Sequence, residues 1–340
     1  MTYTDLDPEV VQWVEMLKSE DLDDRLVAAK ALQHLGDEDT IEALIGVLYD
    51  ESPAVQEIAI TALWEMANPV VVKPLLKCLG SDREEAVRTE ALSALKEIVS
   101  PDDLLTLLDA IQIDDEETQL NVLILLRKIH DAQALGYVLP FFESESTALR
   151  EASVVTLRYL NQVVRCEPAL ALAKDPDEKV RRAAMLTLGH LTDDEVVQLL
   201  CEAMATDPDW QVRRNAAQAI DIHTTTPHDT DTNGTEIQAT ATTLPALTQA
   251  IADEHWQVRK FVARALQTVA TPATIPSLIK ALSDEYSDVR KDAAIALGKI
   301  GHSDALSALQ QTLDDPDRDV QIFSGRAIQA IQQQLSETAR

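Results

Sequence analysis

The sequence predicts an all-α solenoid, a stack of ten helix hairpins of about 31 residues each. Three observations predict it. The 340 residues include only 9 Gly, 4 Trp, 5 Tyr and 4 Phe but are 46% hydrophobic, which suits helices joined by short turns and fits a β-sandwich or barrel badly. A segment built around a Val-Arg pair recurs along the chain. In each copy the apolar residues have the spacing of one helix face.

The recurring segment aligns on one anchor residue, which is Arg in seven copies and Gln in three. Neighbouring anchors are 31 or 32 residues apart, except for one step of 46 residues. Leu or Ile stands seven residues after every anchor, a register that chance does not produce. The anchors are Arg25, Gln56, Arg88, Gln119, Arg150, Arg181, Arg213, Arg259, Arg290 and Gln321.

Each unit is predicted to contain two helices, A and B. Helix B carries the anchor, with apolar or small residues at positions −1, +3, +6, +7 and about +10 relative to it, which form one stripe. Ala at +6 in most units lets a neighbouring helix approach closely. Helix A is a second amphipathic segment upstream, such as 40–48, 70–79 or 274–282, and a short acidic turn separates it from helix B. Because one hairpin cannot bury its apolar face alone, the ten must stack.

Asp occupies the position six residues before the anchor in seven units. An Arg in the first turn of a helix is unfavourable beside the positive end of the helix dipole, so its recurrence implies an acidic partner. Helix capping and an Asp–Arg ladder between neighbouring units both fit the spacing. We expect a structural role for these residues, chiefly Asp175, Asp207, Asp253 and Asp284 with Arg181, Arg213, Arg259 and Arg290.

The Pro residues of helix A (Pro74, Pro245, Pro276), the turn Asp and the Val-Arg pair together resemble HEAT repeats. The short form, with a pattern close to DxxVRxxAxxALG in 177–189 and 288–298, resembles the HEAT-like repeats named after phycocyanobilin lyases. The resemblance covers Pro8 to about Gln332 and implies a right-handed α-α superhelix. Proteins with this repeat include bilin lyases, a di-iron hydroxylase, a DNA glycosylase and many adaptors, so the fold does not define one activity.

Composition and motifs exclude several classes of function. The net charge of −29 argues against a sequence-independent nucleic-acid binder, which needs a basic face. No phosphate-binding loop, zincin motif or hydrolase elbow occurs, and none of the seven His precedes a Glu, the dipeptide that supplies iron ligands in the HEAT-repeat hydroxylase. We therefore expect no cofactor, no metal and no nucleic-acid partner.

The expected compartment is the cytoplasm. The N-terminus lacks the basic region and cleavage site of a signal peptide, and no apolar stretch approaches the ~18–20 residues of a membrane span. The three cysteines, Cys78, Cys166 and Cys201, are isolated and form neither a disulfide framework nor a CxxC site.

The 46-residue step predicts a flexible insertion loop over 223–243, where Thr, Asp, Asn, Pro and Gly replace the apolar periodicity. The predicted organisation is thus one continuous solenoid, with repeats 1–7 over 1–222 and repeats 8–10 plus a C-terminal cap over 244–340. The loop contains His223, His228, Asp229 and Asp231, which lack the rigid spacing of a specific metal site.

Two features near the insertion are candidate partner-binding residues. Trp210 and Trp256 occupy matching positions in two nearly identical helix starts, and they either form a binding platform or pack over the ends of their own hairpins. One residue after the anchor, repeats 6 to 9 carry cations, and a further Arg lies on the same helix as the third. This cationic stripe either receives an acidic peptide or small anion, or neutralises local Asp and Glu. Its members are Arg182, Arg214, Lys260 and Lys291, with Arg264 beside Lys260.

Repeat 4 differs because its helix B is apolar nearly all round. Leu120 and Ile124 occupy positions that are polar in several other units, and Val155 continues the row in repeat 5. This apolar patch marks a protein partner, or it is covered by a neighbouring element.

These features favour a non-enzymatic protein-binding scaffold, an adaptor or assembly factor that holds another protein or an acidic peptide in its groove. A bilin lyase or chromophore-protein chaperone is the alternative that the resemblance implies, and the only enzymatic one. A structural subunit of a larger complex is the third. The acidic turns fit either a basic partner or a saline habitat.

Overall fold

The computed structural model describes residues 7–160, 167–191, 194–225 and 235–338. These residues form twenty α-helices and ten short 3-10 helices, with no strand among them. The helices alternate, so that each odd-numbered α-helix belongs to segment A of a hairpin and each even-numbered one is helix B. The ten predicted hairpins are therefore present in the described chain, and the all-α repeat fold is confirmed.

Contacts divide the chain into two compact units, Met1–Val163 and Val164–Arg340, which hold repeats 1–5 and 6–10. The first unit contains α1 (Pro8–Met16), α2 (Leu22–Leu35), α3 (Ile41–Gly46), α4 (Pro53–Glu65), α5 (Val72–Leu76), α6 (Glu85–Ile98), α7 (Leu104–Ala110), α8 (Glu116–Ile129), α9 (Leu135–Val138) and α10 (Thr147–Leu157). Its 3-10 helices are η1 (Glu38–Thr40), η2 (Val47–Tyr49), η3 (Pro69–Val71), η4 (Pro101–Asp103), η5 (Ala132–Ala134) and η6 (Leu139–Glu143).

The second unit contains α11 (Glu167–Ala171), α12 (Glu178–Leu188), α13 (Asp194–Thr206), α14 (Trp210–Thr225), α15 (Thr235–Ala250), α16 (Trp256–Val269), α17 (Ile275–Ala281), α18 (Ser287–Ile300), α19 (Leu306–Gln311) and α20 (Arg318–Thr338). Its 3-10 helices are η7 (Leu172–Lys174), η8 (Pro272–Thr274), η9 (Ser303–Ala305) and η10 (Thr312–Asp314).

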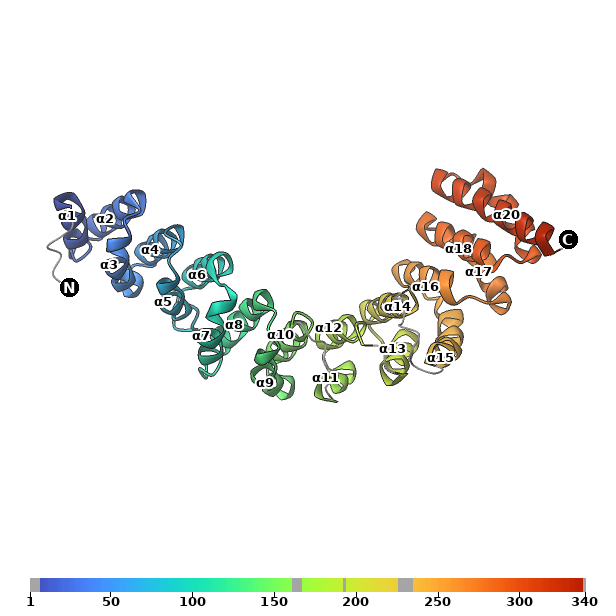
Figure 1. Cartoon of the computed structure of the whole chain (residues 1–340), viewed down its shortest axis with the longest axis horizontal. Helices are drawn as coiled ribbons and strands as arrows, with labels where there is room; N and C mark the ends of the chain where they lie inside the picture. The colour runs from blue at the N-terminus through green and yellow to red at the C-terminus, as the bar shows by residue number, and fades with distance from the viewer. Residues whose placement is uncertain (1–6, 161–166, 192–193, 226–234, 339–340) are drawn as a thin grey trace. The chain divides into compact units, whose positions relative to one another are not determined.

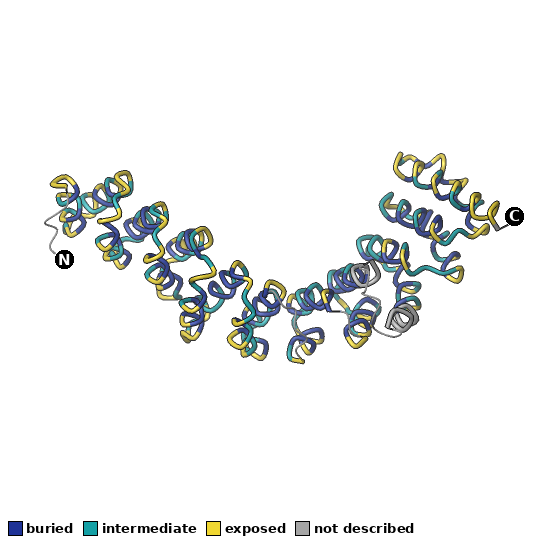
Figure 2. Tube along the Cα trace, in the orientation of Figure 1, coloured by how far each residue is buried: buried dark blue, intermediate teal, exposed yellow. Residues whose placement is uncertain are grey.

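Within each unit the hairpins form two layers, one of A segments and one of B helices (Figure 1). Consecutive B helices contact each other, as do α2, α4 and α6 in the first unit and α12, α14, α16, α18 and α20 in the second. The residues at +3 and +7 of helix B are buried where the layers meet (Figure 2). At +7, nine of the ten Leu or Ile side chains are at most 1% exposed; Ile328 of α20 is half-buried.

Outside α13 and α15 the A segments consist of short helices, which begin at polar caps and prolines. Asp37, Asn68 and Asp131 each accept a hydrogen bond from the backbone N–H two residues ahead, which starts a 3-10 turn. Ser100 and Asp103 form a reciprocal capping box at η4. Such starts satisfy the free N–H groups of the turn and set the direction in which each A segment enters the stack.

The helices differ from the predicted insertion loop over 223–243. Residues up to Thr225 belong to α14, and α15 begins at Thr235, so the predicted loop is too long on both sides. No Gly or Pro interrupts the sequence between Gly234 and Pro245. The helix whose buried face holds Leu247 and Ala250 therefore extends in the N-terminal direction through this Thr-rich stretch. Residues 226–234, with His228, Asp229 and Asp231, lie outside the described residues, as does the side chain of His223. The division into units falls after repeat 5 and not at the insertion.

Two glycines at position +8 permit close approach of consecutive B helices. A Cβ on Gly189 would lie 2.7 Å from the Cβ of Ala219, and one on Gly298 would lie 2.8 Å from that of Ala327. Both partners are the small +6 residues of the next repeat, as the periodicity predicted. Packing at this distance requires Gly against Ala because any larger pair would separate the helices.

We expect Gly298→Ala to lower the free energy of unfolding by about 1–3 kcal/mol, because the added methyl group overpacks the contact with α20. Urea denaturation followed by circular dichroism measures the change. Gly46→Ala is the matched control: it is also helical, but no atom lies within 4 Å of its added Cβ, so this substitution should stabilise by about 0.4–1 kcal/mol. Equal effects of the two substitutions would contradict the close-contact argument.

Candidate binding surface and the polar ladder that positions it

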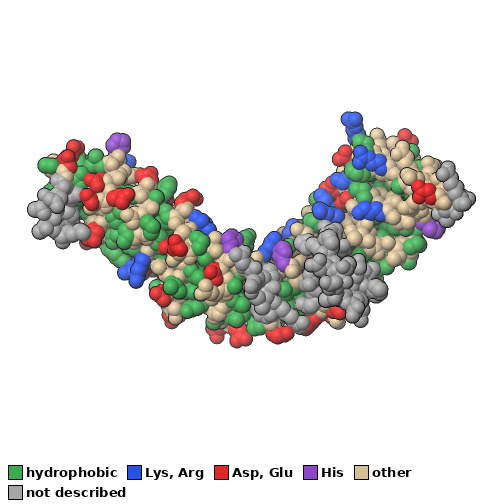
Figure 3. All heavy atoms as spheres, viewed as in Figure 1, with side chains coloured by type: hydrophobic (Ala, Val, Ile, Leu, Met, Phe, Trp, Pro, Cys, Tyr) green, Lys and Arg blue, Asp and Glu red, His purple; other side chains and the backbone are tan. Residues whose placement is uncertain are grey.

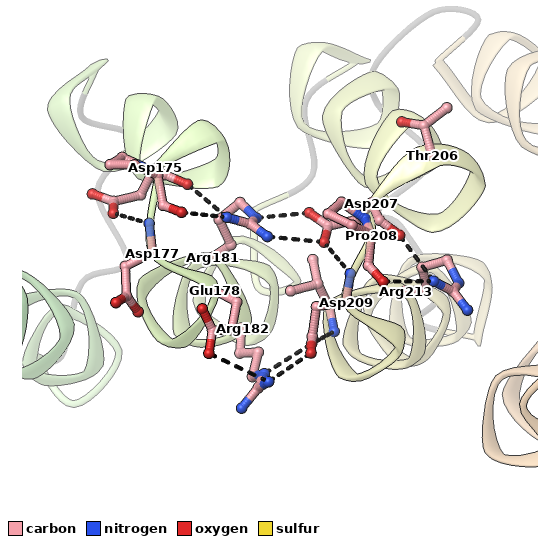
Figure 4. Close-up of polar contacts among 12 residues, drawn as sticks. Asp175, Asp177, Glu178, Arg181, Arg182, Thr206, Asp207, Pro208, Asp209 and Arg213 are labelled. Atoms are coloured by element: carbon pink, nitrogen blue, oxygen red, sulfur yellow. Dashed lines mark hydrogen bonds and ion pairs between the residues drawn. The ribbon is translucent and has the colours of Figure 1, made fainter.

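An Arg at the anchor ties the turn of its own repeat to the turn of the next. Arg181 donates from Nε and Nη2 to the two carboxylate oxygens of Asp207, at 2.8 and 3.1 Å. Its Nη1 donates to the backbone carbonyls of Asp175 and Pro176 at 2.9 and 3.0 Å. Figure 4 shows this guanidinium between the two turns. One planar guanidinium thus binds a carboxylate through Nε and Nη2 and two backbone carbonyls through Nη1.

The same geometry recurs at other anchors, with Nε to Oδ2 distances of 2.6 or 2.7 Å. We call these contacts the Arg–Asp ladder; besides Arg181–Asp207 its described pairs are Arg25–Asp50, Arg213–Asp253, Arg259–Asp284 and Arg290–Asp315. Arg213 and Asp253 are separated by 40 residues, against 25 or 26 in the other pairs, and yet the geometry is retained. The insertion between repeats 7 and 8 therefore leaves the ladder intact.

Each ladder Asp has a second role in its own turn. Asp207 Oδ1 also accepts the backbone N–H of Asp209 at 2.9 Å, and Asp253 Oδ1 accepts that of His255 at 2.8 Å. The carboxylate therefore orders the turn that leads into helix B while it binds the preceding repeat. Both interpretations of the repeated Asp, local capping and bridging between repeats, describe contacts that the structure contains.

A Gln at the anchor makes only half of these contacts. Gln56, Gln119 and Gln321 each donate from Nε2 to the carbonyl six residues earlier, as the Arg residues do. Gln56 does not reach the next repeat: the side chain of Asp82 is 77% exposed, and the buried Oε1 of Gln56 has no hydrogen-bond partner among the described residues. Gln56 therefore preserves the contact within the turn but not the link to the next repeat.

The cationic stripe is largely neutralised. Arg182 binds Asp209 with Nε and Nη2 at 2.8 and 2.6 Å, while Lys260 and Lys291 both contact Asp288, at 2.5 and 3.0 Å. These cations lower the pKa of Asp209 and of Asp288. The side chains of the stripe are also half-buried, with Arg182 at 29% and Lys291 at 26% exposed. Neutralisation of local acids thus describes three of its four members.

Arg214 is the member of the stripe without a carboxylate among the described residues. Its Nε and Nη2 donate to Oδ1 of Asn215, at 3.1 and 2.7 Å, and its guanidinium lies 5.8 Å from the ring centroid of Trp210. Asn215 is 2% exposed and donates from Nδ2 to the carbonyl of Arg182 at 3.0 Å. Arg264 lies on α16 with an exposed side chain. Figure 3 shows Lys and Arg side chains along α16, α18 and α20 of this unit.

Each of the two tryptophans packs against a ring of the following repeat. Trp210 stacks on His255 with ring centroids 4.9 Å apart, and Trp256 stacks on Tyr286 at 4.7 Å. Lys260 lies 6.0 Å from the centroid of Trp256, as Arg214 does near Trp210. Both Trp side chains are half-buried. Each junction therefore contains a cation, a Trp and a second ring in sequence.

The predicted apolar patch occupies two adjacent B helices of the first unit. Leu120 and Ile124 lie on α8 and Val155 lies on α10, which contacts α8. All three side chains are half-buried, so neighbouring elements cover part of the patch and part remains accessible. The patch follows the same +1 and +5 positions that carry the cations in repeats 6–9.

The residues that complete these contacts were not predicted from the sequence. Asp209, His255 and Tyr286 all stand four residues before an anchor, and Asp288 stands two before. The sequence contained a signal for these partners: the residue at position −4 of one repeat complements the residue at position −3 or +1 of the preceding repeat. Recognising it required knowing which faces of adjacent hairpins meet.

Further groups complete the chemical inventory of the described residues. No cluster of three or more His, Cys, Asp or Glu side chains in the described part of the chain has the arrangement of a metal site. Burial raises the pKa of the Cys78 and Cys201 thiols to about 11, which makes them poor nucleophiles, while Cys166 lies outside the described residues. Among the residues searched, no helix is long and apolar enough to cross a bilayer.

A family model of HEAT repeats matches residues 10–96, 165–221 and 244–332, together more than half of the chain. The chain belongs to the HEAT-repeat family. The unmatched stretch between 96 and 165 includes repeats 4 and 5, which carry the apolar patch. No curated protein matches the chain in sequence.

Solved structures share the fold at low sequence identity. An engineered protein is 20% identical with a TM-score of 0.57, and the match covers 96% of this chain and 99% of that one. Importin beta is 16% identical with a TM-score of 0.59, over 95% of this chain and 50% of importin beta. Kap95 in its complex with Nup1 is 15% identical with a TM-score of 0.59, over 96% of this chain and 52% of that one. This HEAT-repeat chain thus spans about half the length of importin beta and of Kap95.

We expect Arg181→Gln to lower the free energy of unfolding by about 1–3 kcal/mol, because Gln keeps the carbonyl contact but leaves the buried Asp207 without its charged partner. Chemical denaturation of the whole chain measures the loss. Lys174→Gln is the matched control, because Lys174 and Glu202 join the same two repeats through side chains that are 69% and 49% exposed. That surface pair should contribute at most about 1 kcal/mol. A control that costs as much as Arg181→Gln would contradict a structural role of the ladder.

Two buried carboxylates, Asp315 in the turn before α20 and Asp292 on α18, should respond to pH with opposite signs. The Arg290 hydrogen bond lowers the pKa of Asp315, so its contribution to stability is present above the unfolded value near 3.9 and is lost as pH falls through the lower folded value. Burial raises the pKa of Asp292, whose Oδ1 accepts only one described hydrogen bond, from Gln267. Its burial therefore costs stability at pH 7 and the cost disappears on acidification.

We expect Asp315→Asn to destabilise the chain at pH 7, with the difference from wild type shrinking between about pH 4 and pH 2. Asp292→Asn should raise the denaturation midpoint at pH 7 and lose this advantage as pH falls below the raised folded pKa of Asp292. Urea midpoints measured from pH 7 to pH 2.5 check both. If both substitutions shift the midpoint in one direction at pH 7, the assignment of the two pKa directions is wrong.

Proposed function

We propose that this HEAT-repeat chain is a protein-binding scaffold, and that its partner contacts the row of helix-B side chains at positions +1 and +5. The observation that carries the proposal is the difference between constant and variable positions. The Arg–Asp ladder keeps its contacts from one repeat to the next, whereas the +1 residues change from Leu and Glu through Arg and Lys to Ile. Solenoids use such a row as an extended binding surface on a repetitive framework.

The composition of the row supports contact with a protein. Half-buried apolar side chains lie on α8 and α10, and half-buried Trp210, Arg214 and Trp256 lie on α14 and α16. Trp and Arg are enriched at protein interfaces. Kap95, which shares the fold, forms a complex with Nup1, and this too supports a protein as the partner. The expected compartment of this activity is the cytoplasm.

Two alternatives come from the sequence. A bilin lyase or chromophore-protein chaperone of the phycocyanobilin-lyase type is implied by the resemblance of the 31-residue repeat. A structural subunit of a larger complex would cover Leu120, Ile124 and Val155 permanently. Both place a protein on the same row and differ in its identity and permanence.

Site-specific photo-crosslinking in the native host tests the proposal. A photoreactive phenylalanine analogue is placed at Ile124 and Gln218 on the B layer, and at Leu105 and Gln198 on the A layer as controls within the same two units. We expect the B-layer positions to give a common covalent adduct and the controls to give none. Adducts of equal yield from both layers, or only from the A layer, would refute the assigned surface.

The identity of the adduct separates the alternatives. A phycobiliprotein subunit would favour the chromophore role. A partner that remains bound in stoichiometric amount through purification would favour the structural subunit, and a substoichiometric partner would favour an adaptor.

A further inference from the structure

The register that neutralises the neighbouring cations leaves Arg214 without a carboxylate from the described residues. Arg182 obtains its partner from position −4 of the next repeat, which is Asp209. Lys260 obtains its partner from position −2, which is Asp288. For Arg214 the equivalent positions of repeat 8 hold His255 and Gln257. Positions −4 and −2 of repeat 8, which would supply an acidic partner, are thus occupied by residues without a carboxylate.

The nearby acid of repeat 8 is committed elsewhere. Glu254 lies 3.1 Å from Nη2 of Arg213 and 3.6 Å from Nε2 of His255. Arg213 also holds Asp253, so these acids belong to the ladder junction. Within the described residues, no ion pair forms to the guanidinium of Arg214, in a chain of net charge −29.

The guanidinium of Arg214 is nevertheless held in position. Asn215 binds two of its nitrogens and is itself buried and hydrogen-bonded to the carbonyl of Arg182. Trp210 provides a ring beside the guanidinium and is stacked on His255. Because Asn215 and Trp210 already hold the guanidinium of Arg214, this side chain loses little conformational entropy when a ligand binds its remaining N–H donors.

From this arrangement we infer that Arg214 is the recognition point for a carboxylate of the partner, an Asp or Glu in an acidic segment, with Trp210 and His255 as the adjoining contact surface. The inference rests on the proposed function and names the chemistry of its partner at one place. A fixed guanidinium binds a carboxylate through two parallel hydrogen bonds. Among the described residues, it is the charge of the cationic stripe that no carboxylate neutralises.

One substitution would give Arg214 a carboxylate partner from the chain itself. His255→Asp would reproduce at repeat 8 the arrangement of Asp209 at repeat 7 and supply Arg214 with an internal carboxylate. Asp209 also accepts the backbone N–H of Val212 at 2.9 Å, whereas His255 caps α16 without a side-chain hydrogen bond. The substitution should therefore preserve or raise the denaturation midpoint while it removes the binding site.

The probe is a set of random twelve-residue peptides displayed on phage and selected on the full chain, followed by fluorescence anisotropy with the enriched peptides. We expect enrichment of Asp and Glu, and a loss of affinity of about tenfold or more for Arg214→Gln and for His255→Asp. Arg214→Lys, which keeps the charge but not the fork, should lose less. Lys280→Gln, which removes an exposed cation of the A layer, should leave the affinity unchanged.

Acidic peptides that bind His255→Asp and Arg214→Gln as tightly as wild type would overturn the inference, as would a selection that yields no acidic enrichment. Displacement of the peptides by a single-stranded oligonucleotide at equal concentration would also overturn it, because the site would then read phosphate and not carboxylate. If B-layer photo-crosslinks to a protein persist unchanged in Arg214→Gln, the role of Arg214 is refuted and the scaffold function is still supported. Absence of B-layer crosslinks in the wild type would count against the scaffold function itself.

Discussion

The pairing of an anchor Arg with the turn Asp of the next repeat is the interaction on which the rest of the second unit depends. Each guanidinium of the ladder joins two turns and two helices of consecutive hairpins, and the side chains of Arg290 and Asp315 are only 11% and 7% exposed. The ions avoid an uncompensated desolvation cost because every pair adds backbone carbonyl and N–H partners. The ladder thereby sets the spacing at which the B helices stack.

That spacing determines which other side chains meet. Once the turns are linked, position −4 of one repeat lies against −3 and +1 of the repeat before it, and the chemistry of each junction follows from these few residues. The junction of repeats 6 and 7 contains an Arg–Asp pair; that of repeats 8 and 9 contains stacked rings and Lys260. Where the anchor is Gln56, the link is missing and Asp82 is exposed to solvent. A constant framework thus supports surfaces that differ from one repeat to the next.

Part of the candidate site could be predicted from the sequence and part could not. The ladder residues were predictable because Arg recurs at the anchor in seven units and Asp recurs six residues before the anchor in seven units, a pattern that a shared contact explains. The partners of Lys260 and Lys291 were not predictable, because Asp288 stands in another repeat from Lys260 and reaches it only through stacking. Trp210 and Trp256 were identified as special, but the rings they contact lie 45 and 30 residues further on.

By itself the sequence determined the all-α repeat architecture, the ten helical hairpins and the residues of their cores, because helical periodicity and a 31-residue period are local properties of the chain. Only the tertiary structure decided which cations are neutralised, how the tryptophans pack, and that Arg214 lacks a carboxylate among the described residues. It also decided how far α14 and α15 extend into the insertion. Electrostatic pairing depends on distances of a few ångströms between side chains of different repeats, and those distances exist only after the hairpins have stacked.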